Sequence, residues 1–445
     1  MNRKRWVAGV ATVAILALVA AACSNDSSSG GSDTGTTSAG PDLTGQTVDV
    51  AATWTSAEQR NFEQVLSLFE EQTGATTQFV STGDDIAAYL GPKIEGGKPP
   101  DVAILPQPGV VSSFASQGDL IPIEDFAGDL IDANYAPGAR EVGTVDGTLY
   151  AVWFRAAQKS TVWYNTHVFD DAGVEPPATW DELVSTAQTI SDSGVPPYSV
   201  GVDVGWPMSD LFENIYLRTA GPDMYDKLAR HEIPWTDQSV KDALSKMADV
   251  LGNGDEIAGG TQGALQTDFN GSVDQMFADP PAGAMLFEGN FVAGVITGET
   301  KAMVGTDADF FDFPSIDGSP PAVMGGGDLA VLLDDTPAGE ALIKFLATPE
   351  AAEVWAGLGG YISPNKNVDI SAYTDPVDQR AAQALVDAGD AVRYDMSDLQ
   401  PTAFGATTGE GIWGILTDFV SDPSDIDGTA QQLEAAAKAA YKQGG

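Results

Sequence analysis

The chain has 445 residues, of which 43% are hydrophobic, and its 21 Lys and Arg against 64 Asp and Glu give a formal net charge of −43. Such a surface repels phosphate backbones and anionic lipid, which argues against nucleic-acid partners and against peripheral membrane binding. One Cys excludes internal disulfides and thiolate metal clusters, and two His leave little for a zinc site or a Ser-His-Asp relay. We therefore expect no metal and no cofactor, and two large domains because this length exceeds a single core.

The first segment of the chain predicts export and lipidation. A basic cluster at Arg3 to Arg5 precedes an apolar run from Trp6 to Ala22, which ends at Cys23, the only cysteine. This pattern is typical of a secretory signal peptide, with an uncleaved membrane anchor as the alternative. The small residues before Cys23 resemble a bacterial lipobox. We therefore expect residues 1–22 to be a signal peptide, and residues 23–41 to be a lipidated Cys followed by a flexible linker rich in Ser, Gly and Thr.

The folded body begins with a strand–helix–strand pattern. A helix is predicted to start at Ser56, where Gln59 stands at the capping-box position, and to stop at Gly74. At this spacing the crossover is right-handed and the sheet is parallel. Strand patterns cover residues 46–53, 76–81 and 101–105.

A second set of elements follows Gly147. Residues 161–164 are strand-like, and Thr179 with Glu182 has the spacing of a capping box at the start of a helix. The alternation of strands and helices predicts an α/β class. Further helices are predicted over residues 338–346, 351–358 and 429–441.

Short motifs then occur in one order along nearly the whole mature chain. They are Gly97–Val102, Asp146–Val152, Trp163–Asn165, Ala172–Val174, Pro177–Leu183, Gly283–Met285, Glu288–Phe291 and Gly325–Gly327. This order resembles that of the extracellular solute-binding proteins of ABC importers, in the sugar-binding branch that includes maltose-binding protein. The segments Ser397–Pro401 and Gly411–Trp413 are most similar to the α-glucoside subgroup.

The resemblance implies two α/β lobes, joined by three chain crossings at a hinge, that close on a ligand in the cleft between them. It assigns residues 42–155 plus 325–368 to the N-terminal lobe and residues 158–322 plus 370–445 to the C-terminal lobe. From the resemblance together with the N-terminal segment, we expect a monomer that is lipid-anchored through Cys23 on the outer face of the cytoplasmic membrane. That monomer would capture an oligosaccharide or glycoside and deliver it to the membrane subunits of an ABC permease, without acting as an enzyme.

Aromatic side chains are the first candidates for binding a sugar, because the C–H face of a pyranose stacks on an aromatic plane. Trp54 follows the first strand, where ligands gather in open α/β sheets. Trp153 lies on the predicted hinge crossing. Trp206, between Gly205 and Pro207, is expected in a loop, and Trp413 stands between Gly411 and Gly414. Phe291 matches the aromatic platform of the family. A core position is the alternative for each tryptophan, and we assign to the core Trp163, Trp180 and Trp355.

Polar candidates follow the same predicted strands and crossings. Three have explicit alternatives: Glu58 favours a helix N-terminus, Arg393 suits an ion pair with Asp395, and Gly326 suits a flexible hinge. The candidates for contact with sugar hydroxyls are Glu58, Gln107, Arg155, Glu288, Gly326, Asp328, Arg393 and Asp398.

Two other functions remain open at this stage. An acid-rich cleft also suits a cationic solute such as a polyamine or peptide, and a secreted carbohydrate-active enzyme would share aromatic residues and acidity. A partial calcium-loop pattern at Asp425 lacks its first ligand, so a helix-initiating turn is the better interpretation. His167 and His231 are expected to be exposed.

Overall fold

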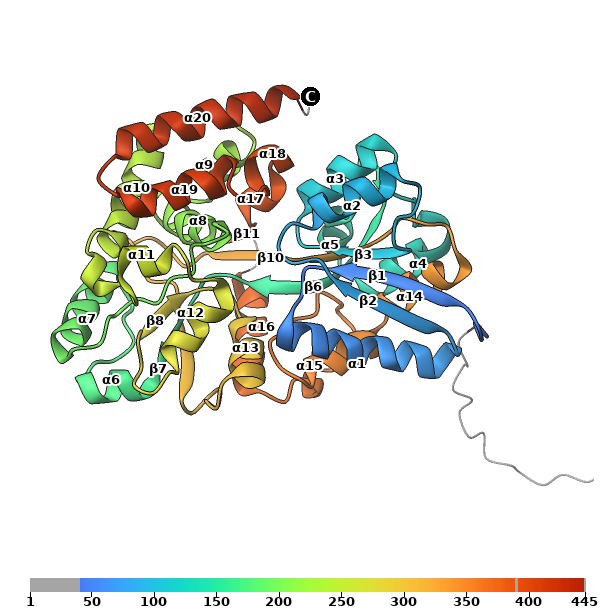
Figure 1. Ribbon diagram of the computed structural model, residues 1–445, viewed down its shortest axis with the longest axis horizontal. Coiled ribbons are helices and arrows are strands. Elements are labelled where there is room, and N and C mark those ends of the chain that lie inside the picture. The colour runs from blue at the N-terminus through green and yellow to red at the C-terminus, as the bar shows by residue number, and fades with distance from the viewer. Residues whose placement is uncertain (1–40, 389–390, 444–445) are drawn as a thin grey trace, which may run out of the picture. The chain divides into compact units, whose positions relative to one another are not determined.

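This computed structural model describes residues 41–388 and 391–443. A six-stranded sheet forms the centre of the first lobe (Figure 1). β1 pairs in parallel with β2 and with β3, which confirms the predicted parallel crossover, whereas β10 runs antiparallel to β3 and to β6. The strands of this sheet are β1 Thr47–Ala52, β2 Thr76–Ser81, β3 Val102–Leu105, β6 Ala151–Gln158, β10 Val323–Leu332 and β11 Val392–Tyr394.

Helices cover this sheet and also make up most of the second lobe. In chain order they are α1 Ser56–Thr73, α2 Ile86–Glu95, α3 Pro108–Gln117, α4 Glu124–Asn134, α5 Pro137–Val142, α6 Thr166–Ala172, α7 Trp180–Ser193, α8 Trp206–Ala220, α9 Pro222–Ala229, α10 Gln238–Leu251, α11 Gly260–Ala264, α12 Phe269–Met276, α13 Val292–Glu299, α14 Pro337–Leu346, α15 Pro349–Ala356, α16 Pro376–Ala388, α17 Met396–Leu399, α18 Thr402–Gly405, α19 Gly411–Ser421 and α20 Ile426–Gln443. Two short 3₁₀ turns cover Gly254–Glu256 and Ile370–Ala372.

The ends of two helices test the capping predictions. At α7 the Thr179 hydroxyl accepts the Glu182 amide and the Glu182 carboxylate accepts the Thr179 amide, so the predicted capping box is confirmed. At α1 the prediction of a capping box at Ser56 and Gln59 is wrong. Thr55 occupies the N-cap there and makes no side-chain capping bond. The predicted stop is confirmed, since Gly74 is left-handed with φ 73°.

The central strand β3 shows why the larger sheet is covered on both faces. Successive side chains of a strand point to opposite faces, so a strand buried on both sides is apolar throughout. Val102 and Ile104 pack in the core formed with α1, α4, α14 and α15. Ala103 and Leu105 pack in the core that includes residues of α2 and α3. Figure 1 shows α1 and α15 below the strands and α2 and α3 above them.

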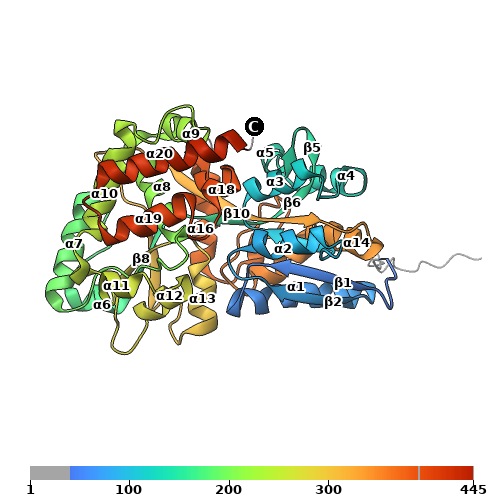
Figure 2. The same ribbon diagram turned by 45° about the horizontal axis from the view of Figure 1, so that its top comes forward.

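A smaller antiparallel sheet forms the centre of a second lobe. Its strands are β7 Thr161–Asn165, β8 Met285–Phe287 and β9 Ala308–Asp312, with β7 in the middle. A separate hairpin consists of β4 Thr144–Val145 and β5 Thr148–Leu149. Figure 2 shows the helices α6, α10 and α11 with this smaller sheet and α1, α4 and α14 with the larger one.

The chain passes between the two lobes three times. It leaves the larger sheet along β6, which is followed after two residues by β7, and it returns along β10. The third passage follows α15, where Ile362 pairs with Ala156 of β6. All described residues belong to one compact unit. The lobe boundaries predicted from the sequence remain a prediction.

Several sequence predictions concern positions outside the binding region. His167 is exposed as expected, with 66% of its side chain accessible, but the expectation for His231 is wrong. Only 14% of its side chain is accessible, and its Nε2 lies 3.1 Å from the Glu434 carboxylate. Trp235, which the sequence left unplaced, is fully buried. The Asp425 carboxylate accepts the Gly428 amide at 3.0 Å, which is the predicted helix-starting turn.

The N-terminal predictions fall outside the part of the chain that the structure describes. The proposed signal peptide 1–22, the lipidated Cys23 and nearly all of the linker 23–41 lie there. Within residues 41–388 and 391–443, the helices lack the length and apolar character that crossing a bilayer would require.

Candidate functional site

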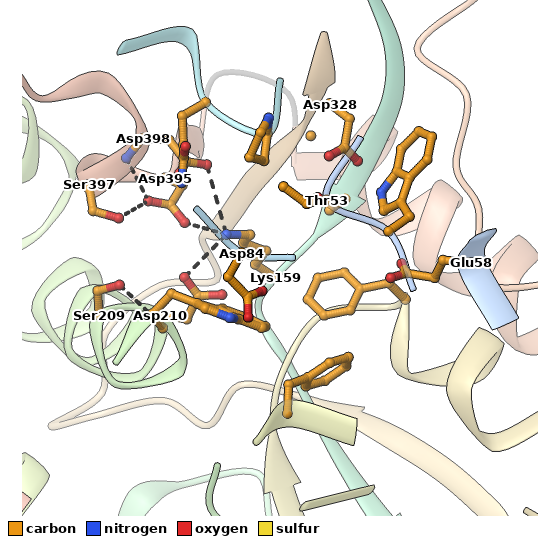
Figure 3. Close-up of a pocket in the computed structure, with 18 of the residues that line it drawn as sticks. Thr53, Glu58, Asp84, Lys159, Ser209, Asp210, Asp328, Asp395, Ser397 and Asp398 are labelled. Carbon is orange, nitrogen blue, oxygen red and sulfur yellow. Dashed lines mark hydrogen bonds and ion pairs between the residues drawn. The ribbon is translucent and has the colours of Figure 1, made fainter. Parts of the chain in front are cut away.

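A cavity of about 280 Å³ lies where the ends of the larger sheet meet helices of the second lobe (Figure 3). The loops after β1, β2 and β3 contribute to one side, and α8, α12, α17 and α19 contribute to the other. Strands β6 and β10 form its floor. Its lining consists of Thr53, Trp54, Thr55, Glu58, Gly83, Asp84, Pro106, Gln107, Arg155, Ala157, Lys159, Trp206, Ser209, Asp210, Asp268, Phe269, Asn270, Phe291, Gly327, Asp328, Asp395, Ser397, Asp398 and Trp413.

Trp54 belongs both to the core and to the cavity wall. It lies two residues after the carboxyl end of β1, in the loop where the sequence predicts it, and it is only 4% exposed. Its ring meets Phe62 edge-on at 4.9 Å and Trp355 edge-on at 4.8 Å between centroids. The alternatives of core residue and cavity residue are therefore compatible here, because one edge is packed while the ring still lines the cavity.

Arg155 joins the elements on the β1 side of the cavity. Its Nη1 donates to Glu58 of α1 at 2.7 Å and lies 3.7 Å from Asp328 of β10, while Nη2 donates to the Gly360 carbonyl at 2.9 Å. The guanidinium also lies 4.9 Å from the ring centroid of Trp355. Burial raises the pKa of Asp328 to about 7, although the charge of Arg155 opposes that shift. One buried cation thus contacts all three passages of the chain.

Lys159 forms a second ionic cluster on the opposite side. Its Nζ lies 2.5 Å from Asp395, 3.2 Å from Asp210 and 3.9 Å from Asp398, and Figure 3 shows the ammonium among the three carboxylates. Burial lowers the pKa of Lys159, but the three acids outweigh burial and hold it well above its ordinary value. Lys159 is therefore one buried cation shared by three buried acids.

Helix α8 brings three cavity residues to one face. Trp206, Ser209 and Asp210 are spaced at i, i+3 and i+4, so they project in nearly the same direction. The sequence prediction placed Trp206 in a loop. That prediction is wrong, because Pro207 is compatible with the first turn of a helix and left-handed Gly205 precedes it at the N-cap.

Glu213 continues the same face of α8 and holds α17 in place. It is fully buried and accepts hydrogen bonds from the backbone amides of Met396 and Ser397 at 2.5 and 2.9 Å. It also accepts the Tyr225 hydroxyl at 2.8 Å. Because α17 begins immediately after Asp395, this carboxylate fixes the backbone that presents Asp395, Ser397 and Asp398 to the cavity.

Aromatic rings form the remaining wall. Trp206, Phe269 and Phe291 contact one another with centroids 5.3 to 6.1 Å apart. Trp413 lies in the first turn of α19, since Gly411 begins that helix. A Cβ on Gly205 would lie 2.6 Å from the Trp413 carbonyl, so only glycine allows α8 and α19 to approach this closely.

Nine of the thirteen ligand-binding candidates predicted from the sequence line this one cavity. In particular, Trp54, Trp206 and Trp413 share it, although each is more than 150 residues from the next in the chain. The nine are Trp54, Glu58, Gln107, Arg155, Trp206, Phe291, Asp328, Asp398 and Trp413.

Two candidates lie behind the wall. Trp153 is on β6, as predicted, but its ring packs against Tyr394 with centroids 5.8 Å apart and does not reach the lining. Glu288 is 1% exposed, and burial raises the pKa of its carboxyl well above the ordinary value. Trp153 was predicted from its place on the hinge crossing and Glu288 from the family segment that it shares with Phe291, and neither of these criteria distinguishes the lining of the cavity from the layer behind it.

The last two candidates, Gly326 and Arg393, do not line the cavity either. Gly327, not Gly326, lines the cavity. Arg393 is also outside the lining, and the alternative of an ion pair with Asp395 is wrong, because its Nε lies 2.8 Å from Asp226 of α9. Asp395 is instead paired with Lys159.

The sequence analysis did not predict Lys159 or its partners Asp210 and Asp395 as site residues. Lys159 interrupts two apolar strand patterns, and this interruption was the one local indication available. Its partners Asp210 and Asp395 are 51 and 236 residues away in the chain, so no local pattern joins them. Asp84 was also missed. Burial, then Asp203 and other nearby acids, raise its pKa to about 6.

The cavity lining carries seven carboxyl groups, from one Glu and six Asp, against the two cations Arg155 and Lys159. Both cations are already paired. Across residues 41–388 and 391–443, His, Cys, Asp and Glu do not form a group of three or more arranged to hold a metal ion. The site therefore offers aromatic faces and hydrogen-bond acceptors in an acidic surrounding.

Comparison with known proteins agrees with this arrangement. A family model described as bacterial extracellular solute-binding protein matches residues 51–353. The chain is 35% identical over 404 residues to the alpha-glucosides-binding periplasmic protein AglE of Rhizobium meliloti, which covers 87% of this chain and 86% of that protein. It is also 35% identical over 380 residues to the osmoprotective compounds-binding protein GgtB of Synechocystis, covering 84% of this chain and 87% of the relative.

Solved structures show the same fold. The bacterial solute receptor AcbH, described as preferring β-D-galactopyranose, superposes with a TM-score of 0.77 at 20% identity, covering 88% of this chain and 99% of that one. Maltose-bound MalE3 of T. maritima superposes with a TM-score of 0.70 at 17% identity, with coverage of 88% and 99%. The predicted fold class, α/β with two lobes and a ligand cleft between them, is confirmed.

Proposed function

We propose that this chain, which belongs to the bacterial extracellular solute-binding proteins, captures a carbohydrate outside the cytoplasm and delivers it to an ABC-type membrane permease. The observation that supports this most directly is the cavity itself, where aromatic rings and carboxylates converge from both lobes. Rings suit the C–H face of a pyranose, and carboxylates accept hydrogen bonds from its hydroxyls. The relative named for α-glucosides favours a glycoside as the solute.

We assign ligand contact to residues whose side chains line the cavity. Trp206, Phe291 and Trp413 would stack on the sugar, and Asp328 and Asp398 would accept hydrogen bonds from its hydroxyls. Because these residues come from both lobes, a ligand that contacts all of them binds the closed arrangement better and shifts the population toward it. The lobe boundaries 42–155 plus 325–368 and 158–322 plus 370–445 belong to this proposal.

Thermal-shift and tryptophan-fluorescence titrations test the proposal. The purified protein is titrated with maltose, trehalose, sucrose, raffinose and galactose, and at least one is expected to raise the melting temperature because it binds only the folded chain. Trp206→Ala should weaken that binding about 10- to 100-fold, as expected for loss of a stacked ring. Tyr89→Ala, an aromatic change on α2 outside the cavity, is the matched control. Unchanged melting across the whole panel would contradict the proposal.

A cationic solute is the second candidate, and the seven carboxyl groups of the lining favour it. Putrescine and spermidine serve as probes, each at low and at high salt. Capture of a cation is expected to weaken as salt screens the carboxylates, whereas capture of a neutral sugar should change little. Stabilisation by either polyamine, without stabilisation by sugars, would replace carbohydrate with a cation in this proposal.

The proposal also includes release of the solute without chemical change and attachment through Cys23. Labelled maltotriose incubated with the protein should be recovered intact, and any turnover would support an enzyme instead. Mass spectrometry of the membrane-bound protein should find a lipid-modified N-terminal Cys23 and no residues 1–22. Light scattering should give the mass of a monomer.

A further inference from the structure

We propose that two glycines outside the cavity lining, Gly109 and Gly298, are positioning residues for solute capture. Each allows two helices from opposite sides of the cavity to touch, and together they fix the arrangement in which the ligand-binding residues of both sides meet. The inference rests on the proposed function, because its main measured effect is the affinity for a solute. The sequence analysis selected neither glycine, and neither lines the cavity.

The first contact joins the start of α1 to the end of α13. A Cβ on Gly298 would overlap the Cβ of Ala57, which is itself only 3% exposed. Arg60 Nη2 also donates to the Gly298 carbonyl at 3.1 Å, in the last turn of α13, where carbonyls lack partners within their own helix. Because Glu58 follows Ala57 in the chain and lines the cavity, this contact lies directly beside the site.

Helix α13 has little room to move away from α1. On its other side Gly294 packs against the third passage of the chain, where a Cβ on Gly360 would lie 2.6 Å from the Gly294 amide nitrogen. Arg155 in turn holds the Gly360 carbonyl at 2.9 Å. Five consecutive residues of α13, 292–296, are buried. A side chain added at Gly298 is therefore accommodated by separating α13 from α1 rather than by a local shift of α13.

The second contact joins the start of α3 to α17. A Cβ on Gly109 would lie 2.5 Å from the Gln400 carbonyl oxygen and 2.9 Å from that of Asp398. These are backbone oxygens, so they cannot rotate away as the end of a side chain could. Helix α17 is also held from behind, since a Cβ on Gly405 of α18 would overlap the Ser397 carbonyl oxygen. Separation of α3 from α17 thus moves Asp398 within the cavity wall.

The two contacts lie on opposite faces of the larger sheet and flank the cavity. Figure 1 shows α3 beside α17 above the strands and the start of α1 beside α13 below them. Helices α1 and α3 follow β1 and β3 of the larger sheet, whereas α13 follows β8 of the smaller sheet and α17 is anchored to α8. Moving the two sides of the cavity apart therefore separates both pairs of helices.

The contacts affect affinity through the population of this arrangement. A solute that touches both sides binds it best, so the apparent Kd equals the intrinsic Kd divided by the fraction of molecules in which the two sides meet. A methyl group in either contact lowers that fraction. Neither Gly109 nor Gly298 has a positive φ, and alanine favours a helix more than glycine does. A loss of affinity on substitution by alanine would therefore not come from unwinding of α3 or α13.

Calorimetric titration of alanine variants tests the inference. The ligand is whichever of maltose, trehalose, sucrose, raffinose and galactose raises the melting temperature of the unmodified protein most. Gly298→Ala and Gly109→Ala should each raise its Kd at least tenfold. Combining Gly298→Ala with Ala57→Gly moves the methyl group from one helix to the other, and should restore the Kd to within threefold of the unmodified value. Gly91→Ala on α2, where a Cβ would meet no atom within 4 Å, is the matched control and should leave the Kd unchanged.

Two results of the titrations would overturn the inference. One is an unchanged Kd in Gly298→Ala, and the other is a loss of affinity that Ala57→Gly does not restore. A second readout needs no solute: the radius of gyration from small-angle scattering should be larger for Gly298→Ala than for the unmodified protein, and the double variant should return to the unmodified value. If no sugar of the panel binds, the proposed function fails, and equal radii for the three proteins would then overturn this inference as well.

Discussion

Two ionic clusters line opposite sides of the cavity. Each is built around a single cation, Arg155 in one and Lys159 in the other, and the two cations contact their partners differently. Arg155 divides its donors among Glu58, Asp328 and the Gly360 carbonyl, and Trp355 lies against its plane. Lys159 has a compact ammonium group, and three carboxylates compete for it. Guanidinium provides five donors in a fixed plane, whereas ammonium is a point charge with three.

The difference indicates two functions for buried charge. Around Arg155 the cation contacts all three passages of the chain, so it holds these passages together where the lobes meet. Around Lys159 acids outnumber the cation, so the cluster can change its charge when a proton or a ligand arrives. Exchanging or removing the groups of each cluster should therefore produce effects of different kind as well as different size.

The largest effect is expected for Lys159→Met. Removing the cation leaves Asp395 and its neighbouring acids buried without a partner, and breaking a buried pair in this way costs about 3–5 kcal/mol. Urea unfolding at pH 7 measures the loss. At pH 5 the loss should shrink, because protonation of the acids replaces the missing charge. Equal losses at both pH values would remove the distinction between the two clusters.

Arg155→Lys sharpens the other half of the comparison. A lysine keeps the charge but cannot bond Glu58 and the Gly360 carbonyl simultaneously, so a buried acceptor loses its donor. We expect a loss of about 1–3 kcal/mol in unfolding free energy. Scattering measurements on the ligand-free protein should also detect a wider spread of lobe angles. A variant with unchanged stability and unchanged scattering would show that charge alone suffices at this position.

Asp378 on α16 tests how the Arg155 side responds to pH. Its Oδ2 accepts the Gly360 amide at 2.9 Å, and burial raises its pKa to about 7. Since the folded-state pKa exceeds the unfolded value of about 3.9, stability contributed by the protonated form is lost as pH rises from 4 through 7. Asp378→Asn should therefore be more stable than the unmodified protein at pH 8, by about 1–2 kcal/mol, and this advantage should disappear at pH 4. Denaturant titrations at the two pH values measure it.

The smallest effect is expected far from both clusters. Thr179→Ala removes the capping box of α7 and should cost about 1 kcal/mol in unfolding free energy. Ligand affinity should not change, because α7 contributes no side chain to the cavity lining. A change in Kd for the bound sugar would indicate that the lobes transmit local stability to the site.

Much of the fold could be predicted because its determinants are local. The capping box at Thr179, the stop at Gly74 and the parallel strands after residue 46 follow from residues within one turn or one strand. Family motifs then located Trp54, Trp206 and the other aromatic residues that meet at the cavity. The secondary structure predicted around them was less accurate. Gly205 and Pro207 suggested a loop at Trp206, but Trp206 is the first residue of a helix.

The charged half of the site could not be predicted for a physical reason. Lys159 and Asp395 are 236 residues apart, and their pairing exists only after β6 and β11 have been placed on opposite edges of β10. Burial of an acid is likewise a property of the folded chain, because 64 acidic residues look alike in the sequence. Arg393 illustrates the reverse error: its sequence neighbour Asp395 was a plausible partner, but Asp226 is the one it meets.

Helix α8 has a consequence for altering specificity. The same surface that presents Trp206 and Asp210 to the cavity also carries Glu213, which anchors α17. Mutations introduced there to admit a new solute would propagate into a neighbouring element. Asn270 anchors no neighbouring element in this way, since it lies half-buried in the first turn of α12 and its side chain donates to Glu299 at 3.1 Å. Engineering this receptor as a sensor for other small molecules should therefore begin at Asn270, where substitutions are expected to reduce the stability of the fold least.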